Sequence, residues 1–167
     1  MKVVISDTNI FIDLLNVDLL DTFLKLPLEV HTTDFIIYEL REEQVEVITE
    51  KINDKKITLN EANEEEYTEI LEQMKERESL SLDDHSVYYY AKKLSATILT
   101  GDRAFRNFAE EKHIEVRGIL WVLDEIITNE LLNKTEMVSK LTCLMETNKR
   151  LPSDECERRL EKWKSKK

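Results

Sequence analysis

Four acidic residues stand at positions where an α/β fold gathers reactive side chains: Asp7, Glu39, Asp84 and Asp102. Asp7 ends one predicted buried strand, and Asp102, behind Gly101, ends another. In open parallel sheets the working groups lie beyond the carboxyl ends of the strands. Asp84 begins a predicted helix and Glu39 lies in another, and both helices lead away from the same edge. We therefore expect the four carboxylates to converge.

Converging carboxylates have a definite chemical consequence. Two like charges about 4 Å apart cost roughly 4 kcal/mol at an effective dielectric near 20, so four need protons or cations to coexist. Ligand sets made of oxygen alone select hard ions such as Mg²⁺ or Mn²⁺ over zinc. An ion held in this way can deprotonate a water and stabilise the leaving oxygen of a phosphodiester. The four acids thus predict a site for metal-assisted phosphodiester hydrolysis.

The elements that must position these acids follow from the apolar pattern. Short apolar runs predict strands at residues 2–6, 30–33, 56–59 at an edge, 96–100 and 114–116. Helical spacing predicts helices at residues 10–15, 35–40 behind an Asp34 cap, 44–52, 61–77, from Ser81 or Asp83 to Leu94, 103–112, 119–132, 134–148 and 153–163. Strands separated by helices predict a parallel α/β sheet. Only two glycines and two prolines argue against an all-β fold, whose tight turns need them.

The length of 167 residues favours one domain with a short extension. We expect the main domain at residues 1–125 and a helical extension packed on it at residues 126–167. The formal charge of −11 is not typical of a nucleic-acid-binding protein. Residues 126–167, however, hold ten bases against seven acids, which could supply a partial basic face.

Other features of the sequence indicate the cellular compartment. Cys143 and Cys156 have no zinc or disulfide spacing, which fits a reducing environment. The apolar run behind Lys2 is too short for a signal peptide, and no stretch reaches the roughly 18 apolar residues of a membrane helix. A cytoplasmic protein without a membrane partner is expected.

The order of the acidic motifs resembles the PIN domain family. The resemblance rests on Asp7-Thr8-Asn9, Glu39, the Ser-Leu-Asp-Asp run at 81–84 and Thr100-Gly101-Asp102, and it covers residues 1–125 best. Residues 118–125 and 150–152 resemble a prokaryotic subgroup with an added helical tail. The implied fold is a three-layer α/β/α arrangement with a central, mostly parallel sheet of four to five strands, plus C-terminal helices.

The resemblance also assigns roles to residues. It makes Asp7, Glu39, Asp84 and Asp102 the catalytic, metal-binding acids, with Asp83 competing with Asp84 for the third place. It also makes Thr8, Asn9 and Thr100 residues that would orient the acids or water, and it places Asn107 near a second metal position. Arg103 and Arg106 suit phosphate contact by their own chemistry, although each could equally pair with a nearby acid.

Several residues keep a structural alternative. Asp7 and Asp84 could be helix caps alone, Asp102 a turn residue, and Glu39 a solvated helix residue. His85 beside Asp84 is expected at the surface rather than in catalysis.

The implied activity is a Mg²⁺- or Mn²⁺-dependent endoribonuclease acting on single-stranded RNA. Many small prokaryotic members are homodimeric toxins of the VapC type, silenced by a small antitoxin protein. The alternative is a catalytically weak PIN-fold protein that binds nucleic acid or regulates protein partners. An aspartate-nucleophile phosphatase is disfavoured, because Asn9 stands where such enzymes need a second aspartate.

Overall fold

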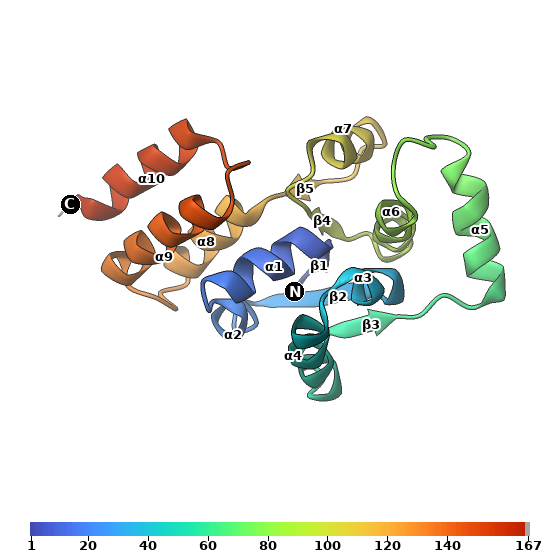
Figure 1. Cartoon of the computed structure of the whole chain (residues 1–167), viewed down its shortest axis with the longest axis horizontal. Helices are drawn as coiled ribbons and strands as arrows, with labels where there is room; N and C mark the ends of the chain where they lie inside the picture. The colour runs from blue at the N-terminus through green and yellow to red at the C-terminus, as the bar shows by residue number, and fades with distance from the viewer. Residues whose placement is uncertain (166–167) are drawn as a thin grey trace.

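The structure, a computed structural model, describes residues 1–165 and is built on one five-stranded sheet (Figure 1). The strands are β1 (Lys2–Ser6), β2 (Leu28–Thr33), β3 (Thr58–Asn60), β4 (Thr97–Leu99) and β5 (Val116–Arg117). Their order is β3-β2-β1-β4-β5, and every pairing is parallel. The expected parallel α/β sheet is confirmed, with β3 at an edge as predicted.

The central strands are buried on both faces, which explains their continuous apolar sequence. Val4 and Ile5 of β1 and Ile98 and Leu99 of β4 have no exposed surface. Val4 pairs with Val30 on one side and with Thr97 on the other. This register brings the ends of β1 and β4 to the same edge of the sheet.

Helices flank the sheet in the α/β/α arrangement that the resemblance implied. Within residues 1–165 they are α1 (Thr8–Asn16), α2 (Leu20–Phe23), α3 (Asp34–Glu39), α4 (Glu42–Asn53), α5 (Glu64–Met74), α6 (Leu82–Leu94), α7 (Arg103–Glu111), α8 (Ile119–Thr128), α9 (Lys134–Thr147) and α10 (Ser153–Lys164). Helix α6 contacts β1, β2 and β4, and α3 contacts β2.

Several helix boundaries differ from the sequence expectation; for example, α8 ends at Thr128 rather than at residue 132. Thr33, not Asp34, caps α3, because its side chain accepts a hydrogen bond from the Ile36 amide. Leu40 is extended, so α3 ends at Glu39 and α4 starts afresh. Helix α5 begins at residue 64 rather than 61, since Asn63 closes a capping box there. The short helix α2 was not predicted.

Helices α9 and α10 pack on each other at the opposite end of the molecule from α5 (Figure 1). Helix α9 also contacts α1 and α8. Asn148, the C-cap of α9, donates to both carboxylate oxygens of Asp13 in α1, at 3.2 and 3.0 Å. The division of the chain at residue 126 stays a prediction. Across residues 1–165, every helix is too short or too polar to cross a membrane.

Candidate active site

Asp7 lies at the centre of the site, directly after β1, with 4% of its surface exposed. It caps α1 by accepting a hydrogen bond from the Thr8 amide at 2.8 Å. The Thr100 hydroxyl donates to Asp7 Oδ2 at 2.7 Å, and Asn9 Nδ2 donates to the same oxygen at 3.2 Å. Asp7 is therefore both a helix cap and a member of the converging group.

The turn after β4 places Asp102 beside this group. The Gly101 amide donates to Asn9 Oδ1 at 2.8 Å. The Asp102 amide donates to Thr100 Oγ1 at 3.1 Å. Asp102 Oδ1 then caps α7 by accepting from the Phe105 amide at 2.8 Å. Thr100 thus ties the two aspartates to one strand end.

Glu39 reaches the site from the end of α3. The Thr8 hydroxyl donates to Glu39 Oε2 at 2.6 Å, although the glutamate itself is exposed. The start of α3 is held to α6, because Thr33 Oγ1 lies 2.9 Å from the buried Ser86 Oγ. Ser86 in turn donates to the Asp83 carbonyl at 2.7 Å. Sequence reasoning missed this Thr33–Ser86 link, which no local pattern indicates.

Asp83 and Asp84 both arrive on the first turn of α6. Ser81 caps the helix: its hydroxyl accepts from the Asp84 amide at 3.1 Å, while Asp84 Oδ2 accepts from the Ser81 amide at 3.2 Å. Of the two residues expected to cap this helix, Ser81 and Asp83, Ser81 is the N-cap of α6. Asp84 has a capping role as well as a place near the other acids.

Burial, together with neighbouring negative charge, raises the pKa values of three of these acids, Asp7, Asp83 and Asp84. Burial, the charge of Asp84 and that of Glu39 raise the pKa of Asp7 to about 6 against the Thr100 hydrogen bond, which lowers it. Burial and the charges of Asp102 and Glu39 raise the pKa of Asp84 to about 6. Burial, contact with Glu39 and the nearby acids raise the pKa of Asp83 to about 7. The structure thus brings all four predicted acids and Asp83 into one electrostatic cluster.

The cluster contains carboxylate oxygens that could bind a cation, but these oxygens are not close enough together to coordinate one. Within residues 1–165 no three acidic, histidine or cysteine side chains stand in an arrangement that could hold a metal ion as they are. The donors are all carboxylate oxygens, and burial, followed by the charges of Asp84 and Glu39, raises the pKa of Asp7. The donor chemistry therefore fits Mg²⁺ or Mn²⁺, and binding requires the side chains to draw together.

The predicted supporting residues divide into two groups. Thr8, Asn9 and Thr100 hydrogen-bond the acids, as described above. Arg103 and Arg106 lie on α7, where Arg106 Nη1 donates to a backbone carbonyl at 3.3 Å and pairs with Glu110 at 3.6 Å. Asn107 is exposed on α7 and makes no hydrogen bond to the acids within residues 1–165.

His85 is fully buried, so the surface position expected for it is wrong. Its Nε2 lies 2.8 Å from the Arg77 carbonyl, and its Nδ1 lies 3.1 Å from Gln73 Nε2. Both ring nitrogens are used, and His85 ties α6 to α5 and to the turn after it. No pattern around His85 in the sequence indicates this, because the partners come from a separate, charged helix.

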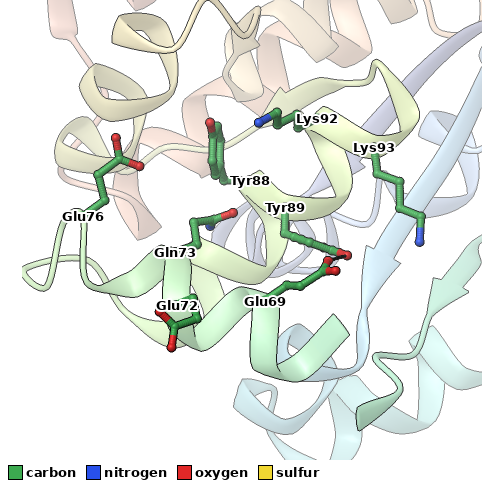
Figure 2. A pocket seen from close by; sticks show the side chains of 8 residues that line it. All are labelled: Glu69, Glu72, Gln73, Glu76, Tyr88, Tyr89, Lys92 and Lys93. Atoms are coloured by element: carbon green, nitrogen blue, oxygen red, sulfur yellow. Dashed lines mark hydrogen bonds between the residues drawn. The ribbon is translucent and has the colours of Figure 1, made fainter. Parts of the chain in front are cut away.

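A hollow of about 740 Å³ lies away from the acids, between α5 and α6 (Figure 2). Its walls carry Glu69, Glu72 and Glu76 from α5 and the following turn, and Tyr88, Tyr89, Lys92 and Lys93 from α6. Tyr89 donates a hydrogen bond to Glu69 across it (Figure 2). None of the predicted site residues lies there.

A family model described as a PIN domain matches residues 3–165. The chain belongs to the PIN domain family. This family is one of nuclease-type folds, and its members are generally hydrolases. The match spans α9 and α10 as well as the sheet, so the C-terminal helices belong to this kind of PIN domain. No curated protein sequence matches the chain.

Proposed function

We propose that this PIN domain is a Mg²⁺- or Mn²⁺-dependent endoribonuclease that hydrolyses phosphodiester bonds of single-stranded RNA. One observation carries the proposal: at one edge of the sheet the buried Asp7 shares the Thr100 hydroxyl with the Asp102 amide, and the neighbouring Thr8 holds Glu39 Oε2 at 2.6 Å. A fold gains nothing in stability from like charges gathered in this way. Their placement makes sense as a cation site.

Asp7, Glu39, Asp84 and Asp102 would hold the ion. When bound, a divalent ion makes a water acidic enough to attack phosphorus and neutralises charge on the leaving oxygen. Asp83 lies close enough to Glu39 to share in the site, because contact with Glu39 adds to the rise of its pKa that burial causes.

Hydrogen bonds define what the neutral residues contribute. Thr100 and Asn9 fix Asp7 Oδ2, and Thr8 fixes Glu39 Oε2. A held carboxylate loses less side-chain freedom when a ligand binds, so these contacts favour cation capture.

Three finer expectations rest on the resemblance alone and stay predictions: the VapC-type toxin role, the small antitoxin partner and the homodimer. The cytoplasmic location likewise stays a prediction. Each concerns partners or surroundings rather than the chemistry of the cluster.

The test compares cleavage of 5′-labelled single-stranded RNA by the wild type, Asp102→Asn and Asp54→Asn, in Mg²⁺, Mn²⁺ and EDTA. Asparagine caps helices as well as aspartate does, so Asp102→Asn removes a charge while α7 keeps its cap. Asp54 is an exposed residue at the end of α4 and serves as the matched control.

We expect cleavage by the wild type and Asp54→Asn, and its loss in Asp102→Asn and in EDTA. Cleavage that survives Asp102→Asn would contradict the proposed site. A complete lack of cleavage, together with a melting temperature that Mg²⁺ leaves unchanged, would favour the alternative of a catalytically weak binding or regulatory protein.

A further inference from the structure

A groove of about 1140 Å³ begins beside the acidic cluster and runs toward the C-terminal helices. Asn9 and Thr100, which hydrogen-bond Asp7, form part of its lining. One wall comes from α7, β5 and α8. Other parts of the lining come from α1 and from the connection between α9 and α10, with Lys149 and Arg150.

The lining of the groove is positively charged, although the chain as a whole is negatively charged. The chain carries −11, yet six cationic and only three acidic residues line this groove. The cationic residues are Arg103, Arg106, Arg117, Lys149, Arg150 and Arg159. Two of the acids are already engaged, Asp124 by Arg159 and Asp13 by Asn148.

Three of the cations have no counter-charge of their own. Arg103, Lys149 and Arg150 are exposed and make no ion pair within the part of the chain that the structure describes. Exposed cations that line a concave surface are typical of a site that binds a polyanion. The hollow between α5 and α6 lacks this character, since it is lined by three glutamates and two lysines.

Arg106 lies against backbone that also lines the groove. A Cβ on Gly118 would lie 3.3 Å from Arg106 Nη2, tighter than most such contacts, so glycine leaves room for the guanidinium there. The Val116 carbonyl accepts from Arg106 Nη1 at 3.3 Å. The Arg106 guanidinium therefore lies beside Val116 and Gly118, both of which also line the groove.

An aromatic side chain completes the lining. Trp121 of α8 is half-buried and lines the groove, with Lys2 Nζ 5.4 Å from its ring centroid. A cationic track with an aromatic platform is the combination by which proteins hold single-stranded nucleic acid, with phosphates on the cations and a base on the ring. The bases of a duplex are already stacked on one another, so the indole favours a single strand.

We propose that this groove binds the backbone of single-stranded RNA on one side of the bond to be cut, with α9 and α10 supplying one of its walls. The inference rests on the proposed function, because the groove begins at the acidic cluster. It gives the C-terminal helices a role that the acids alone do not suggest. Arg103 and Arg106 of α7, and Lys149 and Arg150 of the α9–α10 connection, would contact successive phosphates.

The test measures binding without cleavage, by fluorescence anisotropy of a labelled single-stranded RNA of about a dozen nucleotides in EDTA. The groove variant Lys149→Ala with Arg150→Ala is compared with Lys25→Ala with Lys92→Ala. The two double variants change the net charge equally, and all four residues are exposed and make no ion pair within residues 1–165. Only the first pair lies in the groove.

We expect the groove variant to weaken binding roughly 5- to 20-fold at low salt and the control to stay within about twofold. The slope of log affinity against log salt should fall by about 0.7 for each phosphate that the groove variant no longer neutralises. Trp121→Ala should weaken binding several-fold without changing that slope. In a Trp163→Phe background, RNA should quench the fluorescence of the remaining Trp121.

Equal effects of the two double variants, or no effect of the groove variant, would overturn the proposal. So would groove-dependent binding of a poly-glutamate peptide with none of RNA. Asp102→Asn separates this proposal from the proposed function, since it should abolish cleavage and keep RNA affinity. If the wild type never cleaves but the groove variant still loses RNA affinity, the nuclease proposal fails and the groove assignment stands.

Discussion

The Thr100 hydroxyl donates a hydrogen bond of 2.7 Å to Asp7 Oδ2, joining the ends of β4 and β1 across 93 residues of sequence. The same hydroxyl oxygen accepts from the Asp102 amide at 3.1 Å. The Thr100 side chain thus fixes the carboxylate of Asp7, which follows β1, and the backbone of Asp102, which follows β4. The spacing of two acids that neighbouring strands deliver depends on this contact.

Replacing Thr100 with valine should lower both stability and activity. The change keeps the shape but leaves a buried carboxylate without one of its donors, which costs about 1–2 kcal/mol. It should also raise the pKa of Asp7 further above 6, because the Thr100 hydrogen bond holds that pKa down. We expect a right-shifted pH profile of RNA cleavage. Thr100→Ser, which keeps the hydroxyl, should restore the profile, and an unchanged profile in Thr100→Val would contradict the role.

The stability of the metal-free protein should fall as pH rises from about 4 to about 7. The pKa values of Asp7, Asp13 and Asp84 are raised to about 6 and that of Asp83 to about 7, so the folded state binds more protons than the unfolded state in this window. Ionising the buried Asp7 alone contributes about 3 kcal/mol to the loss. Urea unfolding in EDTA at pH 4 and pH 8 measures most of the difference.

Mg²⁺ should reverse this dependence. The ion binds the ionised carboxylates, so it should stabilise the protein at pH 8 and have little effect at pH 5. Asp84→Asn, which still offers an oxygen to the Ser81 amide, should make the metal-free protein more stable at pH 8 and abolish the Mg²⁺ response. The same Mg²⁺ response at both pH values would indicate binding elsewhere.

The sequence predicts the fold well because the signals for it are local. Apolar runs mark β1 and β4, and the aspartates that follow those runs end up at one edge of the sheet. Parallel strands put their carboxyl ends together whatever the details, so Asp7 and Asp102 could be placed without knowing any distance.

What escaped prediction depends on contacts between distant segments. Asp83 and Asp84 are adjacent in sequence, and only the packing of α6 against α3 shows that both approach Glu39. The groove joins α7 to the α9–α10 connection, which lies beyond two further helices along the chain. The basic bias of residues 126–167 was visible, but the face it occupies was not.

His85→Ala should destabilise the fold without a direct effect on chemistry. The imidazole is fully buried and bridges Gln73 and the Arg77 carbonyl, so its loss leaves a cavity and unpaired polar groups. We expect a cost of about 2–4 kcal/mol in denaturant unfolding. Cleavage per folded molecule, measured well below the melting temperature, should match the wild type, and a fall of about a hundredfold would restore a catalytic role for His85.

Arg159→Lys should loosen α10 from the domain. The guanidinium donates from Nε and Nη2 to the Asp124 carboxylate of α8, with contacts of 2.7 to 3.1 Å, and lysine lacks the planar fork that makes this bidentate pair. Because the pair is only partly exposed, we expect a cost of about 1–2 kcal/mol. Hydrogen exchange should speed up along α10 and stay unchanged in β1. Arg158→Lys, one position away and outside any ion pair within residues 1–165, is the matched control. If both variants loosen α10 equally, the Asp124 pair is not what holds this wall of the groove in place.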